Sequence, residues 1–223
     1  MEDVSLEEYL AAAAIDLHAN FEGGGGHANK QLVLVRGGFG AVAKLATDDQ
    51  TRRQARSEVA AYAVARALGW DDLVPVTVYR TVPSPSGDVE ASVQILWPSF
   101  KTAAELGIDH TSVAETDSWR VAILDVLLMN SDRNASNWGQ VAQTRIALID
   151  HGHALIGGQP GLGSDFATSR LGHEIPAPMK EALERLTSSG GGQLRDIAEE
   201  GDHDRILALA GENLSTGNLT SGV

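Results

Sequence analysis

The apolar positions of this chain follow two different periods. Between residues 49 and 68, and again from 115 to 129, they recur every three or four positions, which is typical of α-helices with one buried face. Elsewhere in the first hundred residues they alternate or form short blocks, which is typical of β-strands, at 31–35, 41–45, 73–80 and 91–97. This mixture predicts an α+β fold with an antiparallel sheet in its amino-terminal half.

Residue types at the ends of these segments support the assignments. Asp49 suits the N-cap of the first long helix and Gly69 its carboxy-terminal end. Ser112 and Glu115 have the spacing of a capping box in front of the second. Further along the chain we expect two short strands and then amphipathic helices, at 138–141, 145–149, 176–186 and 194–209.

Three polar residues in the second half have the spacing of a kinase active site. Asp132 follows the helix that ends near residue 129, Asn137 comes five residues later, and Asp150 follows the strand at 145–149. In protein kinases an Asp orients the acceptor hydroxyl, an Asn five residues on binds magnesium, and a second Asp at a strand end completes the metal site. The spacing therefore predicts that Asp132 orients a hydroxyl and that Asn137 and Asp150 bind Mg²⁺, an ion that prefers oxygen ligands.

Two glycine clusters precede Lys44, and only the first leaves room for a strand in between. A kinase covers the phosphates of ATP with a glycine-rich loop between its first two strands and contacts them with a lysine on the third. Gly26 lies 18 residues before Lys44, whereas Gly40 lies four before it. The cluster at 37–40 is therefore expected to form a hairpin turn. The first cluster is the predicted phosphate loop, or alternatively a flexible linker, with the candidate ligands Gly23, Gly24, Gly25, Gly26, His27 and Asn29.

Lys44 has a candidate partner in the helix over 49–68. Glu58 lies at the edge of the apolar face of that helix, where a carboxylate needs a cation. No cation stands three or four positions away from it on the helix. We therefore expect an ion pair between Glu58 and Lys44, with Lys44 on the α- and β-phosphates of ATP. Gln94 and Leu96, near the end of the strand at 91–97, are expected to line the adenine pocket.

Composition narrows the choice of partners. The 223 residues include 17 Lys and Arg against 30 Asp and Glu, a formal net charge of −13 that repels nucleic acid and anionic lipid surfaces. No apolar run is long enough to cross a bilayer, and the acidic start differs from a signal peptide. Without cysteine the chain has neither a disulfide framework nor a thiolate nucleophile. We expect a cytoplasmic protein with no nucleic-acid partner and no stable membrane association.

Further motifs are shared with a known group of kinases, namely Ser57–Tyr62, Ala67–Trp70, Leu73–Pro75, Asn130–Arg133, Ile149–His153 and Glu174–Pro176. In this combination, between residues 23 and 186, the chain resembles small bacterial members of the phosphatidylinositol 3-/4-kinase-like superfamily, of the actinobacterial type, and more distantly the HipA-type toxin kinases. The resemblance implies a two-lobed protein-kinase-like fold that uses ATP and a divalent metal. It implies roles for Lys44, Glu58, Asp132, Asn137 and Asp150. Because HipA-type kinases phosphorylate proteins, it does not imply a lipid substrate.

The chain departs from these relatives at two positions. They carry a His two residues after the catalytic Asp, where this chain has Asn134, and an amide does not accept a proton near neutral pH. Asp132 would then have to act alone. The metal-binding Asp is followed by His151 and Gly152, so an aromatic switch of the DFG type is not expected. Asp150 with His151 and His153 offers a zinc site as an alternative.

Together these features predict four regions. Residues 1–20 form an N-terminal helical segment with a helix from Ser5 to Asp16, and residues 21–98 form a kinase N-lobe with an antiparallel sheet and one main helix. A reduced, mostly helical C-lobe with the catalytic and metal-binding loops is expected over 99–212. A disordered tail is expected over 213–223.

The predicted function is that of an ATP- and Mg²⁺-dependent atypical kinase, which transfers the γ-phosphate to a hydroxyl on a protein rather than on a lipid. The alternative is a nucleotide-binding pseudokinase that acts as a regulatory or interaction module, favoured by Asn134 and the short C-lobe. A metal-dependent phosphatase or nuclease built on Asp132, Asp150 and the histidines is a third reading, and it would not need Lys44.

Overall fold

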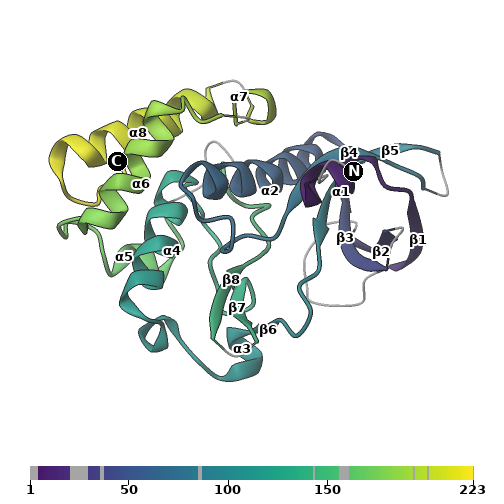
Figure 1. Ribbon diagram of the computed structural model, residues 1–223, viewed down its shortest axis with the longest axis horizontal. Helices are drawn as coiled ribbons and strands as arrows, with labels where there is room; N and C mark the ends of the chain where they lie inside the picture. Colours follow the sequence, from purple (N-terminus) through teal and green to yellow (C-terminus); the bar gives the residue numbers. More distant parts are fainter. Residues whose placement is uncertain are drawn as a thin grey trace.

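The computed structural model describes residues 5–20, 30–35, 38–84, 87–142, 144–155, 161–192, 194–199 and 201–222. Its elements form two parts, a five-stranded antiparallel sheet with a short helix beside it and a mainly helical part around three short strands. The long helix α2 (Asp49–Ala67) runs between these two parts (Figure 1). The α+β prediction is confirmed.

The larger sheet contains β1 (Ile15–Asn20), β2 (Lys30–Val35), β3 (Phe39–Leu45), β4 (Thr77–Val82) and β5 (Val89–Ile95), in the order β1-β2-β3-β5-β4 with all neighbours antiparallel. The predicted hairpin joins β2 and β3, with Val35 opposite Phe39. In its turn Gly38 has a φ of +90°, a conformation that glycine adopts without strain. The same register places Lys30 opposite Lys44.

Helix α2 begins one residue earlier than its sequence predicts. Asp48, not Asp49, is the N-cap, and its side chain accepts a hydrogen bond from the backbone N–H of Thr51. At the other end Gly69 has a φ of +76°, as expected for the residue that ends a helix. The helix contacts β3, β4 and β5 on one side, and α4, α6 and α7 on the other.

The amino-terminal segment is not helical to Asp16 as predicted. Helix α1 covers only Leu6–Ala12, and Ala13 is already extended, with φ −63° and ψ 146°. The chain then forms β1, which pairs with β2. The alternation of apolar and polar residues from Ile15 onward suits an edge strand, and pairing with β2 provides the backbone hydrogen bonds that continued helix would have supplied.

The second part contains a small sheet in the order β6-β7-β8, made of β6 (Lys101–Thr102), β7 (Trp138–Val141) and β8 (Arg145–Leu148). Its helices are α3 (Ala103–Leu106), the 3₁₀ turn η1 (His110–Ser112), α4 (Glu115–Leu127), α5 (Asp165–Thr168), α6 (Ala177–Ser188), α7 (Leu194–Ile197) and α8 (Asp202–Thr216). The predicted capping box before α4 does not form. Ser112 belongs to η1, and Ala114 precedes the helix without a side-chain cap.

The predicted disorder after residue 212 is not observed in the described residues. Helix α8 continues to Thr216, Asn218 pairs with Glu174, and Leu219 is 1% exposed. The Asn213 side chain accepts from the backbone N–H of Thr220 at 2.7 Å. Asn213 and Leu219 are both buried, so this segment packs against the rest of the protein instead of forming the expected disordered tail.

Buried apolar side chains form two clusters. The smaller is formed by the five-stranded sheet together with α1 and includes Leu10, Val33, Val35, Ala41 and Ala43. The larger extends from the second half of α2 to α8 and Leu219. Within the described ranges, no helix has the length and apolar character needed to span a membrane.

Candidate functional site

The ion pair expected between β3 and α2 is present. Lys44 and Glu58 are both buried, with 8% and 1% of their surface exposed, and the Lys44 ammonium contacts Glu58 Oε1. The helical period places Glu58 on the buried face of α2, and the strand period places Lys44 on the face of the sheet opposite the core positions Ala43 and Leu45. The pair therefore ties the third strand of the sheet to α2.

Asp150 joins this pair from the second part of the molecule. It follows β8 and has a φ of +56°, a left-handed conformation that Asp tolerates better than most residues. Its Oδ1 atom lies 2.7 Å from Lys44 Nζ, and its Oδ2 atom lies 2.6 Å from Lys30 Nζ. Lys44 thus bridges Glu58 and Asp150, two carboxylates 92 positions apart in the sequence that come from different parts of the fold.

These contacts keep the cluster ionised. Burial alone would lower the pKa of Lys44 and raise the pKa of each carboxyl group, because burial disfavours the charged form. The ion pairs outweigh burial. Glu58 and Asp150 raise the pKa of Lys44, Lys44 lowers the pKa of Glu58 to about 2, and the two lysines hold the pKa of Asp150 below its ordinary value.

The loop between α4 and β7 orients the other two predicted functional residues. Asn137 Nδ2 donates to the backbone oxygen of Asp132 at 2.7 Å and to its Oδ2 atom at 3.1 Å. Asn134 Nδ2 donates to Asp132 Oδ1 at 2.8 Å. Because the amide nitrogen of Asn137 is directed at Asp132, its Oδ1 atom is the group left to face a metal ion.

A buried arginine, which sequence reasoning missed, brings Asn137 and Asp150 together. Arg133 Nη1 donates to the backbone oxygens of Asn137 at 2.6 Å and Ile149 at 3.0 Å, and Ile149 immediately precedes Asp150. The backbone N–H of Ile149 also donates to the Asn137 oxygen at 3.0 Å. One guanidinium group therefore fixes the backbone beside both candidate metal ligands.

Arg133 is held in turn by Asp125 of α4, and neither side chain is exposed. Asp125 accepts from Arg133 Nη2 at 3.0 Å, from Asn130 Nδ2 at 3.0 Å and from Ser164 Oγ at 2.7 Å. The sequence does contain a signal for this ion pair, because Asp125 stands on the apolar face of α4 and a buried charge requires a partner. Lys30 was also missed, because its contact with Asp150 depends on strand register.

His151 is fully buried beside this site. Its Nδ1 atom lies 3.7 Å from Glu58 Oε2, which is too long for a hydrogen bond, and among the described residues neither ring nitrogen has a hydrogen-bond partner. Burial and the Arg133 charge lower the pKa of His151 and favour its neutral form. His153 is exposed, and in the part of the chain that is described no three His, Cys, Asp or Glu side chains gather as metal ligands. This argues against the zinc alternative.

The predicted adenine-pocket residues lie on the same side of the sheet as Lys44. Gln94 stands opposite Val42 of β3, two residues from Lys44, and its Nε2 atom donates to Thr77 Oγ1 at 2.9 Å. Leu96 follows β5, is 39% exposed, and its backbone N–H donates to the Gly40 oxygen at 2.9 Å. The predicted phosphate loop lies outside the described residues, at Gly23, Gly24, Gly25, Gly26, His27 and Asn29.

The residues present fit a magnesium site. The Asp150 carboxylate and the Asn137 amide oxygen are hard oxygen donors, and Mg²⁺ usually takes one or two such protein ligands together with substrate phosphates. Lys44, paired with Glu58, supplies a fixed positive charge beside them. Asp132 supplies a carboxylate on the loop that carries Asn137. Chemically, the group can bind a metal and a polyphosphate and can orient a hydroxyl.

Known structures share this fold over nearly the whole chain. The proinflammatory kinase CtkA of Helicobacter pylori matches with a TM-score of 0.53 and 13% identity, over 94% of this chain and 94% of CtkA. Hydra Fam20, solved with a sugar, matches with a TM-score of 0.55 and 14% identity, over 94% of this chain and 87% of Fam20. No family model and no curated protein matches the sequence. The predicted kinase-like fold is confirmed, and this evidence concerns the fold alone.

Proposed function

We propose that the protein is an atypical kinase that uses ATP and Mg²⁺ to phosphorylate a hydroxyl group. The observation that carries the proposal is the bridging position of Lys44 between Glu58 and Asp150, which joins β3, α2 and the end of β8. A lysine held by a helix glutamate beside a metal-binding aspartate is the arrangement by which kinases position ATP. An ion pair that only stabilises the fold is complete with two charges, so it does not need a third charge from another part of the molecule.

Each residue has a role in this proposal. Lys44 contacts the α- and β-phosphates and Glu58 orients it, while Asn137 Oδ1 and the Asp150 carboxylate hold Mg²⁺. When bound, magnesium neutralises charge on the transferring phosphoryl group. Asp132 accepts the hydroxyl proton as the oxygen bonds to the γ-phosphorus and the bond to ADP breaks. Residues 23–29 cover the phosphates, and Gln94 and Leu96 line the adenine pocket.

The acceptor is proposed to be a protein rather than a lipid or nucleic acid. The net charge of −13 opposes approach to anionic lipid headgroups and phosphate backbones. We also propose that the protein is cytoplasmic and that it belongs to the phosphatidylinositol 3-/4-kinase-like superfamily. The superfamily assignment rests on the sequence motifs.

The test is phosphate transfer from γ-labelled ATP, with Mg²⁺, into a protein mixture or the enzyme itself. Lys44→Met, Asp132→Ala and Asp150→Asn are each expected to lower transfer by about 100-fold or more, because each removes a group needed for transition-state charge or proton transfer. Exposed control positions are Lys101→Met and Asp88→Asn, which should keep wild-type rates. Robust turnover in both Asp132→Ala and Asp150→Asn would contradict the proposal.

A second candidate, a nucleotide-binding pseudokinase, is favoured by one observation. Asn134 donates to Asp132 and cannot accept a proton, so no second base stands beside Asp132 among the described residues of this loop. Thermal and chemical unfolding with Mg²⁺–ATP tests whether the nucleotide binds, and the transfer assay tests whether its phosphate is transferred. At 100 times its dissociation constant the ligand should add about 2.7 kcal/mol to the free energy of unfolding. Such binding without phosphate transfer or hydrolysis would identify a pseudokinase.

A further inference from the structure

Both carboxylate oxygens of Asp150 are occupied by lysines. Lys44 Nζ lies 2.7 Å from Oδ1 and Lys30 Nζ lies 2.6 Å from Oδ2. A metal ion bound directly by Asp150 needs at least one of these oxygens. Each oxygen keeps a second lone pair, but the ammonium group beside it repels a metal ion, so Asp150 binds metal more readily once one ammonium has moved away.

The two lysines differ in how firmly they are held. Lys44 is buried and also paired with Glu58, so it keeps a partner when Asp150 is taken from it. Lys30 is the first residue of β2, its side chain is 16% exposed, and within the described ranges its ammonium bonds only to Asp150. Lys30 is the one that can leave at lower cost, provided another anion receives it.

Strand register explains why Lys30 and Lys44 need an anion between them. They stand directly opposite each other on β2 and β3, where like charges repel. Two lysines and two carboxylates, Glu58 and Asp150, balance to zero net charge in this cluster. A divalent cation alone would meet an Asp150 carboxylate whose charge the lysines already neutralise, whereas a metal–nucleotide complex brings phosphates that can receive Lys30.

We propose that Lys30 is a positioning counterion that couples metal binding to nucleotide binding. It occupies Asp150 Oδ2 until phosphate takes it, and Asp150 then becomes free to bind Mg²⁺ that arrives with the nucleotide. Lys30 is thereby a second phosphate-binding lysine, beside Lys44. The inference rests on the proposed function, since it assumes that ATP occupies the site.

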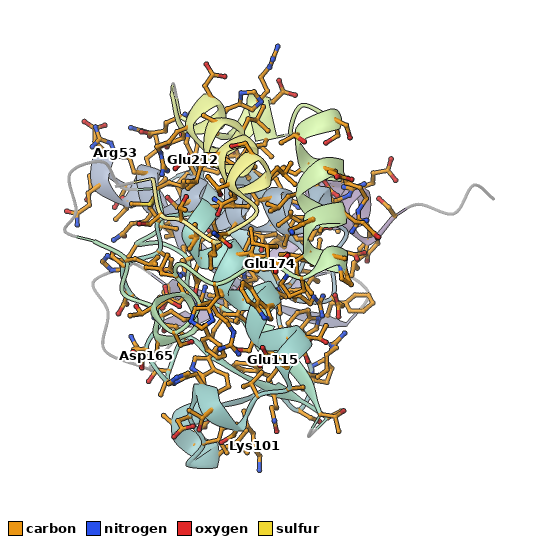
Figure 2. All side chains as sticks on the ribbon, turned by 90° about the vertical axis from the view of Figure 1, so that its left-hand side faces the viewer. Arg53, Lys101, Glu115, Asp165, Glu174 and Glu212 are labelled. Atoms are coloured by element: carbon orange, nitrogen blue, oxygen red, sulfur yellow. The ribbon has the colours of Figure 1, made fainter. Side chains whose placement is uncertain are left out.

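The experiment measures metal binding without any nucleotide. Mn²⁺ is titrated into the 223-residue protein, and the free Mn²⁺ is followed by electron paramagnetic resonance. Wild type, Lys30→Arg and the surface control Lys101→Met should bind weakly. Lys30→Met and Lys30→Gln should bind Mn²⁺ about tenfold or more tightly, because removing one ammonium frees Asp150 and removes repulsion. Lys101 suits the control because it lies at the lower end of the molecule in Figure 2 and carries the same charge.

Two further measurements test whether Lys30 acts through Asp150 and through phosphate. The gain in Mn²⁺ affinity should disappear when Asp150→Asn is added to Lys30→Met, since Asp150 is the ligand released. In EDTA, ATP should bind Lys30→Met about tenfold more weakly than Lys101→Met, because one phosphate contact is lost. Circular dichroism of each variant confirms that it is folded, and two neutral variants guard against one failing to fold.

The outcomes separate the two proposals. Equal Mn²⁺ affinity of the folded neutral Lys30 variants and Lys101→Met would overturn the counterion role. A gain in Mn²⁺ affinity without loss of ATP affinity would overturn the transfer of Lys30 to phosphate. Failure of wild type to bind ATP with Mg²⁺ would instead overturn the proposed function, whereas the Mn²⁺ comparison would still report on Lys30 and Asp150.

Discussion

Glu58 is the residue that, together with Asp150, allows the buried Lys44 to remain charged. It is 1% exposed, and its contact with Lys44 lowers its pKa to about 2. Replacement by Gln keeps the shape of the side chain and removes the charge. In this variant Lys44 keeps Asp150 alone as its anionic partner, and the proposed function also requires Asp150 to bind the metal ion.

We expect Glu58→Gln to lower the free energy of unfolding by about 1–3 kcal/mol, because a buried cation loses a charged partner. The exposed helix variant Glu181→Gln is the control and should stay within about 0.5 kcal/mol of wild type. Urea unfolding measures both. A Glu58→Gln protein as stable as this control would show that the pair contributes nothing net.

The difference in stability between wild type and Glu58→Gln should depend on pH. The folded-state pKa of Glu58, about 2, lies below the ordinary value of 4.5, so the carboxylate stabilises the fold above pH 4.5. This contribution decreases as pH falls from 4.5 toward 2, because the carboxyl group of the unfolded chain is protonated over this range before that of the folded protein. The stability difference between wild type and Glu58→Gln should therefore shrink over this range. A constant difference down to pH 2.5 would contradict the assignment.

Several site residues could be predicted individually because their signals are local in the sequence. Asp132, Asn137 and Asp150 follow from spacing around predicted elements, and Glu58 follows from its place on a helix face. Lys30 could not be found in this way. Its role depends on which residue of β3 it faces and on an aspartate 120 positions away. Such contacts depend on strand register and on the approach of the two parts, which one sequence does not contain.

At the scale of elements, Arg133 is the anchor of the loop between α4 and β7. It joins Asp125 of α4 to the backbone before β7 and after β8, with no exposed side-chain surface. Breaking a buried pair on one side leaves an uncompensated charge, whereas exposed pairs contribute little. The geometry of Asn137 and Asp150 should therefore depend on this single ion pair.

We expect Arg133→Met to destabilise the protein by about 3–5 kcal/mol, because it leaves the Asp125 carboxylate buried without its cation. Adding Asp125→Leu should recover part of that loss. The control Arg52→Met removes an arginine whose partner Asp49 is 94% exposed, and should cost less than about 1 kcal/mol. Denaturant unfolding of wild type, Arg133→Met, Asp125→Leu and the double variant gives the double-mutant cycle. Additive losses in Arg133→Met and Asp125→Leu would refute the coupling.

Periodicity predicted the elements well where an element buries one face, as in α2, α4 and the hairpin of β2 and β3. It failed where the outcome depended on pairing or capping. The expected helix from Ser5 to Asp16 extends into the first two residues of β1, whose partner β2 comes later in the chain, and α4 begins without a side-chain cap although Ser112 stands nearby. Local sequence describes the propensity of a segment, and the surrounding structure selects among its options.

At the scale of the whole molecule, the last described residues complete the larger core. Leu219 is 1% exposed and belongs to the cluster that extends from α2 to α8. Backbone hydrogen bonds from Gly172 to Leu219 and from Leu219 to His173 hold it there. A segment expected to be disordered is therefore part of the folded unit.

Leu219→Ala should lower the free energy of unfolding by about 2–5 kcal/mol, the range for a buried leucine replaced by alanine. Leu6→Ala is a matched control, since Leu6 is 41% exposed, and should cost less than about 1 kcal/mol. Calorimetry or denaturant unfolding compares them. Equal stability of the two variants would restore the original expectation of a free tail.

Helix α2 has a consequence for hydrogen exchange. It lies against the sheet on one side and supplies six consecutive buried residues, from Ala60 to Ala65, to the larger core on the other. The amide protons of its buried stretch, from Ser57 to Ala65, can exchange with solvent only when the surrounding structure opens, so they should be among the slowest in the protein. Glu58 lies within this slowly exchanging segment. The group that holds Lys44 would then be among the last parts of the site to move, while Lys30, at the start of a strand, would be free to change partners around it.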